Sequence, residues 1–241
     1  MPDVRDDFNL SRAAEQYSRL LSLAVHEFRT PASVVGGYLR MLMRDSDPAL
    51  SERQRKMVEE AEKSCARIVA IVSEMSDIGK LDGGILALAR QPLDTFSVVR
   101  EVAELVHEAE DREVHLQVRG DDQGAPMSGD APRLRSAFTA IFRAILREKT
   151  GPSTVVAERR VVTADGRRSA IVIVSEDASV QEAYEREPVP FDEKRGGLGL
   201  ALPLARRVFE GHGGRLWSPK AVRDNDQVAR SSAIVSLPIT E

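Results

Sequence analysis

The first third of the chain carries apolar residues at alternating steps of three and four. In its first segment, from about Leu10 to Arg44, these positions are Leu21, Val25, Phe28, Ala32, Val35, Leu39 and Leu42. This spacing predicts a long helix whose apolar seam packs lengthwise on other helices. Pro31 lies inside the segment and offers no N–H to the carbonyl of Glu27, so we expect the helix to bend there.

A second helical segment follows the helix-breaking sequence Asp45-Ser46-Asp47-Pro48. Ser51 and Gln54 have the spacing of a capping box that begins it. Its apolar residues recur at Val58, Ala61, Cys65, Ile68, Val72 and Met75. Two such helices form a hairpin that cannot bury its apolar face alone, so we predict a homodimer joined through a four-helix bundle. The alternative is a hairpin that packs on a second domain of its own chain.

The pattern changes after Gly83-Gly84, which predicts a hinge between a domain at 1–84 and another at 85–241. We expect helices from Asp94 to about Glu110, after Asp130, and from Leu198 to Glu210. Strands are predicted at 114–118, 153–163, 168–175 and 230–238, the middle two joined by a turn at Asp165-Gly166. Interleaved strands and helices predict an α+β fold, an α/β sandwich with helices on one face of a mixed sheet.

The composition is that of a globular protein, with 42% hydrophobic and 30% charged residues among 241. A net charge of −4 does not favour binding to nucleic acid or to an anionic membrane. The single cysteine, Cys65, excludes an internal disulfide and falls on an apolar repeat, where it is expected to pack in a core. The sequence has no membrane-spanning apolar run and no signal-peptide core, so a cytoplasmic protein is expected.

One histidine has the surroundings of a nucleophile. His26 lies one position past the seam residue Val25, so its ring should point to solvent, and Thr30 shares its face one turn later. The neighbouring Glu27 is close enough to accept a hydrogen bond from the imidazole and fix its tautomer. Such an imidazole can accept a phosphoryl group. The alternative is an ordinary exposed histidine on a bundle helix.

The string His26-Glu27-Phe28-Arg29-Thr30-Pro31 resembles the phosphoacceptor box of sensor histidine kinases, His-Glu-apolar-basic-Thr-Pro. The resemblance implies that His26 is phosphorylated, that the protein dimerises, and that it exchanges phosphoryl groups with receiver domains of response regulators. It also implies that Thr30 can orient a water against a receiver's phosphoaspartate. Helical geometry predicts a receiver-docking surface around His26 that includes Arg29, Ser33 and Arg40.

The second half resembles the ATP-binding domain of the same family. The matching segments are Gly129-Asp130-Ala131-Pro132-Arg133-Leu134-Arg135, Phe191, Gly196-Gly197-Leu198-Gly199-Leu200 and Gly211-His212-Gly213-Gly214. The resemblance would assign nucleotide contacts to Asp177, or its neighbour Glu176, and to Gly197 and Gly199. We favour a structural role for both glycines, and for His212 a role in the turn that ends a helix.

Two departures set this second half apart from the family. Asparagines that hold Mg²⁺ and phosphate in the family align with Ala140 and Ala144, whose methyl groups cannot bind a metal. In place of an Asp-x-Gly-x-Gly box, the strand at 171–174 runs into Ser175-Glu176-Asp177-Ala178-Ser179-Val180, without the glycines. The lid that follows, from about Ala178 to Arg195, is short and rich in charge and proline. We therefore expect no bound metal and a degenerate nucleotide site.

Three functions remain open. The favoured one is a histidine phosphotransfer protein, with some phosphatase chemistry, that needs no cofactor of its own because the receiver supplies Mg²⁺. The second is an active histidine kinase that uses ATP and Mg²⁺ in a divergent pocket. The third is a dimeric adaptor that binds receivers or a kinase without turnover. An upstream kinase or sensor is a further expected partner.

Overall fold

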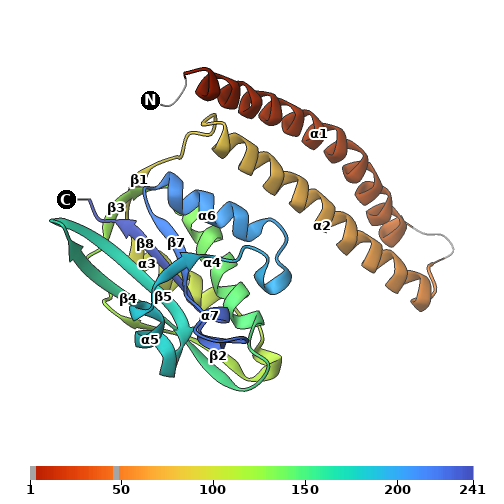
Figure 1. Cartoon of the computed structure of the whole chain (residues 1–241). Helices are drawn as coiled ribbons and strands as arrows, with labels where there is room; N and C mark the ends of the chain where they lie inside the picture. Colours follow the sequence, from red (N-terminus) through yellow and green to blue (C-terminus); the bar gives the residue numbers. More distant parts are fainter. Residues whose placement is uncertain (1–3, 46–48, 241) are drawn as a thin grey trace. The chain divides into compact units, whose positions relative to one another are not determined.

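The computed structural model describes residues 4–45 and 49–240, with side chains in the first helix from Leu21 onward except that of Ser22. Contacts divide the chain between Leu86 and Ala87 into two compact units (Figure 1), which are described separately. Among the described residues, no helix combines the length and hydrophobicity needed to cross a bilayer.

The first unit is a hairpin of two long helices, α1 (Val4–Asp45) and α2 (Glu52–Asp82). The predicted capping box is confirmed: the Ser51 hydroxyl accepts from the Gln54 N–H, and the Gln54 side chain accepts from the Ser51 N–H at 2.9 Å. Cys65 is 6% exposed and its thiol donates to the Ala32 carbonyl at 2.9 Å, so the predicted core position is confirmed. Pro31 lies inside α1, which curves along its length in Figure 1.

The predicted seam of α1 divides into two stripes. Val25 is 5% exposed and, together with Ala32, lies on the side that packs on α2. Phe28, Val35 and Leu42 are 56%, 52% and 47% exposed. The reason is geometric: one partner helix covers only part of an apolar face this wide. The uncovered stripe also carries Tyr38 and Met41, which border a groove of about 250 Å³.

The second unit is a six-stranded mixed sheet in the order β2-β4-β5-β8-β7-β6, with a separate β1-β3 pair. Among the strands of the described residues, β2 and β4 form the only parallel pair. The strands are β1 (Gln91–Asp94), β2 (Val114–Gly120), β3 (Pro126–Gly129), β4 (Ser153–Ala164), β5 (Arg167–Glu176), β6 (Pro188–Pro190), β7 (Arg215–Pro219) and β8 (Ala233–Pro238). The longer helices are α3 (Thr95–Leu105), α4 (Ala131–Arg147) and α6 (Ala201–Gly211), and the short ones are α5 (Val180–Glu185) and α7 (Gln227–Arg230). This is the α+β architecture that the sequence predicts.

The main core lies between the sheet and the layer of α3, α4 and α6 (Figure 1). Phe138 of α4 is fully buried, with its ring centroid 5.1 Å from Phe209 of α6 and 6.1 Å from Phe142. Arg159 of β4 is 3% exposed and donates to the Phe96 carbonyl of α3, which places it on the same side of the sheet. Asp94 and Asp130 cap α3 and α4 as predicted.

Several elements differ from their predicted form. The helix after Asp94 ends at Leu105, before the predicted Glu110, and the helix near Leu198 begins at Ala201. The predicted lid is not a simple loop. It contains α5 and β6, and Val180 of α5 packs on the face of the sheet opposite the main core. Strands β1, β3, β6 and β7 are too short to have a periodic signal.

Replacing Asp226 with asparagine is expected to lower the free energy of unfolding by about 2 kcal/mol at neutral pH. N–H groups of Val222 and Ala229 and the guanidinium of Arg186 donate to this buried carboxylate, and they lower its pKa from 3.8 to about 2. Because the folded state prefers the charged form, this stabilisation is present above about pH 4 and disappears as the pH falls towards 2. Urea unfolding at several pH values measures it.

The exposed Asp224 is two residues away, so the Asp224→Asn variant is the matched control and should stay within about 0.5 kcal/mol of the unmodified protein. A difference between Asp226→Asn and the unmodified protein that persists unchanged at pH 2 would contradict this role of the carboxylate.

Candidate functional site

The histidine box lies on the solvent-facing side of α1. The His26 side chain is 80% accessible, and its Nδ1 is 3.5 Å from Oε1 of Glu27, which is 71% accessible. That distance is within ion-pair range but longer than a normal hydrogen bond. Thr30 is also exposed, and its hydroxyl points back to the His26 carbonyl at 3.4 Å. The second imidazole nitrogen, Nε2, is therefore open to a reacting group.

The three predicted docking residues lie on the same helix, and all are exposed. Arg29 donates to the Ser73 hydroxyl of α2 at 3.3 Å. Arg40 lies 3.8 Å from Glu62, also of α2. Both arginines thus reach across to the second helix, so a surface built on them includes residues of α2.

In the second unit, the helix that would hold Mg²⁺ is covered by a glycine turn. Ala144 is fully buried and Ala140 is 7% exposed. A Cβ added to Gly196 would lie 3.0 Å from the Ala144 Cα, so the turn packs directly on the helix backbone. Arg147 donates to the Gly196 carbonyl at 3.0 Å, and Glu148 accepts from its N–H at 3.3 Å. These contacts fix the turn on α4.

The side chain of Arg195 lies under the same turn. Its two Nη atoms donate to the carbonyls of Ser232 and Ala229 at 2.9 and 2.8 Å. Its guanidinium carbon is 4.8 Å from the centroid of the Phe191 ring. Burial lowers the pKa of Arg195 below its ordinary value, although the group stays protonated. An arginine held by two carbonyls and a ring has a fixed position.

A second internal cation is located at the end of α4. Lys149 is 3% exposed, and its Nζ donates to the Glu176 carboxylate and to the Ser231 hydroxyl, both at 2.9 Å. Glu176 is one of the two acidic residues that could have contacted a nucleotide base. Its carboxylate is instead paired within the protein.

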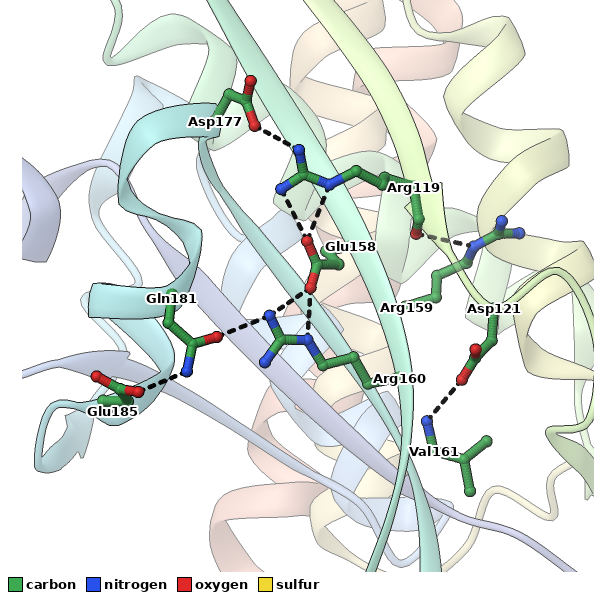
Figure 2. A network of polar contacts seen from close by, with 9 residues as sticks. All are labelled: Arg119, Asp121, Glu158, Arg159, Arg160, Val161, Asp177, Gln181 and Glu185. Atoms are coloured by element: carbon green, nitrogen blue, oxygen red, sulfur yellow. Dashed lines mark hydrogen bonds and ion pairs between the residues drawn. The ribbon is translucent and has the colours of Figure 1, made fainter.

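The other acidic residue, Asp177, faces a different side of the sheet. Figure 2 shows it bound to Arg119 of β2 at 2.6 Å, and Arg119 also binds Glu158 of β4 at 2.8 Å. Burial of the Glu158 carboxyl favours its neutral form, but hydrogen bonds from Arg119 and Arg160 outweigh this and hold its pKa below the ordinary value. Arg160 extends the network to Gln181 of α5. Asp177 is thus held by a surface ion pair.

The predicted glycines and His212 have clear structural positions. Gly197 and Gly199 have φ of +60° and +66°, a conformation that favours glycine, and both are exposed beside the first turn of α6. His212 is 2% exposed; its Nδ1 bonds to the Val208 carbonyl and its Nε2 accepts from the Asp130 N–H at 2.9 Å. It therefore joins the end of α6 to the start of α4.

These residues do not fit ATP and Mg²⁺. The helix positions expected to bind the metal are buried alanines, and both candidate carboxylates form ion pairs with other residues of the chain. The described residues include no cluster of three or more histidine, cysteine or acidic side chains suited to a metal. Sequence reasoning missed Lys149 and Arg195 because nothing in a sequence distinguishes a cation that bonds within the protein from a solvated one.

Comparison with known proteins relates the first unit to a phosphoacceptor domain and most of the chain to histidine kinases. Residues 16–84 match the His Kinase A (phospho-acceptor) domain. The chain is 27% identical over 214 residues to the signal transduction histidine-protein kinase BarA of Escherichia coli, and 28% identical over 228 residues to the sensor protein CutS of Streptomyces coelicolor. These alignments cover 84% and 90% of this chain, but only 23% of BarA and 53% of CutS.

Two solved structures share the fold. Full-length ShkA in complex with AMPPNP has a TM-score of 0.67 and 20% identity, covering 92% of this chain and 46% of ShkA. The histidine kinase ThkA, in complex with the response regulator protein TrrA, has a TM-score of 0.56 and 16% identity, covering 97% of this chain and 66% of ThkA. The two structures support the fold, and the phosphoacceptor match together with the aligned kinases supports a sensor histidine kinase family for this chain.

Proposed function

We propose that this protein is a histidine phosphotransfer protein, in which His26 exchanges phosphoryl groups with the aspartates of receiver domains. The observation that carries the proposal is the contrast between the two units. The histidine box is complete and exposed, whereas the two positions of α4 expected to bind Mg²⁺ are buried alanines, one of them under the turn at Gly196. Phosphoryl transfer from a receiver requires an accessible histidine but does not require a nucleotide site.

The transfer step uses the open nitrogen of the imidazole. The lone pair of Nε2 of neutral His26 attacks the phosphorus of a receiver's aspartyl phosphate as the bond from phosphorus to the aspartyl oxygen breaks. The aspartate leaves as a carboxylate. Glu27, beside Nδ1, stabilises the positive charge that develops on the ring. The reverse step passes the group to a second receiver, and in both directions the receiver holds the Mg²⁺.

Phosphatase activity is a second reaction of the same surface. Thr30 is exposed one turn from His26 and its hydroxyl has only a long contact, at 3.4 Å, with the helix backbone. This hydroxyl can orient a water for attack on a docked aspartyl phosphate. Arg29, Ser33 and Arg40 then contribute to the docking surface, together with Ser73 and Glu62 of α2, which two of them contact.

Two other functions predict different results. An ATP-dependent kinase is favoured by the relatives, and ShkA was solved with AMPPNP, but it requires an oxygen ligand for Mg²⁺ where Ala140 and Ala144 are buried. A non-enzymatic adaptor predicts receiver binding without label transfer. The intact Glu27 and Thr30 favour a reacting protein over an adaptor.

The deciding experiment supplies the phosphoryl group from two sources. The purified protein is incubated with labelled ATP and Mg²⁺, and separately with a panel of purified receiver domains carrying labelled aspartyl phosphate. The proposal expects label from a receiver and none from ATP. Label from ATP makes the protein a kinase, and receiver binding without label makes it an adaptor.

We also propose that the protein is a homodimer joined through the uncovered stripe of α1. Replacing Tyr38 with glutamate would bury two charges in that interface and should raise the dimer dissociation constant about a hundredfold. Sedimentation equilibrium measures it. Ala66→Glu makes the same change at an exposed position of α2, on the opposite side of that helix from Ile68, and should leave the dimer intact. Equal effects of both variants would place the interface elsewhere.

A further inference from the structure

The face of the sheet opposite the main core carries an ordered surface. Strand register places Arg160, Ile171, Ser236 and Arg215 in one row across β4, β5, β8 and β7. Because side chains alternate along a strand, these four residues share a face with Val156 and Ile173 of the outer core cluster. At a strand spacing of about 4.8 Å, the two arginines are separated by roughly 14 Å at the backbone.

Helix α5 covers only one side of this row. Val180 is buried against the outer cluster, whereas Tyr184 and Trp217 pack on its edge and stay partly exposed. On the other side, the next row consists of Val162, Ser169 and Pro238, all half-buried. Ile171, in the middle of the row, is 6% exposed, so the accessible part of the uncovered strip consists of the half-buried Ser236 and the next row.

Both arginines of the row are held over aromatic rings. The guanidinium carbon of Arg160 is 5.4 Å from the Tyr184 ring centroid, and that of Arg215 is 5.6 Å from the Trp217 ring centroid. Stacking of this kind limits the freedom of a guanidinium. It leaves the N–H groups of Arg215 available, whereas Arg160 already donates from Nε and Nη2 to Glu158 and Gln181. The two cations are thus positioned at either end of the strip before any partner binds.

Two of the three arginines on this face form no ion pair within the described part of the chain. Arg160 shares Glu158 with Arg119 and also donates to Gln181. Within the described part of the chain, Arg215 forms no ion pair. The same is true of Arg167, which register places on this face one row beyond Ser169.

We propose that this strip binds an extended acidic segment of a partner protein. In an extended chain, residues four apart lie about 13 to 14 Å from each other and point to the same side. Two carboxylates at that separation match Arg215 and the remaining Nη1 of Arg160, and an apolar residue midway between them would lie over Ser236, beside the buried Ile171. The recognised pattern is acidic-x-apolar-x-acidic, bound by charge-assisted hydrogen bonds to guanidinium edges.

A polypeptide fits the strip better than a nucleic acid does. The acidic side chains Glu182, Glu185 and Glu187 lie along or just after α5, beside the strip, and the chain as a whole has a net charge of −4. A continuous polyanion would have to pass these carboxylates, whereas a short segment with two acidic residues need not.

The test uses a fluorescein-labelled peptide with two glutamates four positions apart around a central leucine, titrated with the full chain and followed by anisotropy. Saturable binding is expected, and Arg215→Glu with Arg167→Glu should weaken it by about tenfold or more. Arg168→Glu is the matched control, because register places this exposed residue on the opposite face. Thermal unfolding checks that each variant is folded.

Three results would overturn the proposal. They are the absence of saturable binding by the unmodified chain, an equal loss with Arg168→Glu, and equal binding of a peptide with lysines in place of the glutamates. Tighter binding of heparin that is lost in the same Arg215 and Arg167 variant would instead assign the strip to polyanions. None of these outcomes depends on phosphorylation of His26, so this experiment tests peptide binding independently of the proposed phosphotransfer.

Discussion

The His26→Gln variant is expected to accept no label from any phosphorylated receiver that labels the unmodified protein. The glutamine amide has no lone pair on nitrogen that can attack phosphorus, so the N–P bond cannot form. The side chain is 80% accessible, so its replacement should leave the free energy of unfolding unchanged within about 0.5 kcal/mol. The measurement is label on the protein after incubation with the receiver carrying labelled aspartyl phosphate.

The chain offers a matched control for this experiment. His115 is an exposed histidine on β2, and His115→Gln should accept label at the unmodified rate. Glu27→Gln is expected to slow the transfer by about tenfold or more, because the ring loses its charged neighbour. Label that persists in His26→Gln would place the phosphoryl group on another residue and contradict the proposed relay.

Local signals in the sequence predicted the frame of the molecule well. Ser51 and Gln54, Asp94, and Asp130 each begin a helix as their side chains predict, because a cap is satisfied within a few residues. The β4–β5 hairpin was predicted for the same reason, with Asp165-Gly166 at its turn. The position of Cys65 followed from helical periodicity.

What the sequence could not predict depends on contacts between distant residues. The seam of α1 divides because α2 covers Val25 and leaves Phe28 and Val35 uncovered. The sequence could not predict which face of the sheet α5 covers, because a helix of six residues is too short to show a periodic pattern. Burial of Lys149 requires Glu176 and Ser231, which lie 27 and 82 positions away, to meet it.

The contacts of Ala144 with the turn at Gly196 change the interpretation of the missing metal ligands. From the sequence, Ala140 and Ala144 indicate only that two ligands are gone, and a pocket could have remained around them. In the structure the space beside Ala144 belongs to the turn at Gly196, and Arg195 is bonded beneath it. The alanines are thus one part of a packed interior, which explains why returning a single ligand should not return a site.

The Ala144→Asn variant is accordingly expected to lose about 3 kcal/mol of unfolding free energy and to gain no nucleotide binding. Ala144 is fully buried, and the Gly196 backbone is already so close that a Cβ there would lie 3.0 Å from the Ala144 Cα. An asparagine would overfill this space, at about 1–3 kcal/mol, and would bury an amide without partners, at about 1–3 kcal/mol more. Urea unfolding gives the first quantity, and calorimetric titration with AMPPNP and Mg²⁺ gives the second.

Ser136→Asn makes a comparable change at an exposed position of the same helix and should stay within about 0.5 kcal/mol of the unmodified protein. ShkA, which was solved with AMPPNP, is the positive control for the titration. A stable Ala144→Asn variant that binds the nucleotide would mean that the turn at Gly196 opens readily. The second unit would then be a nucleotide domain that lacks only its ligands. Loss of stability without binding is the result expected if the space beside Ala144 is closed by the packed turn at Gly196.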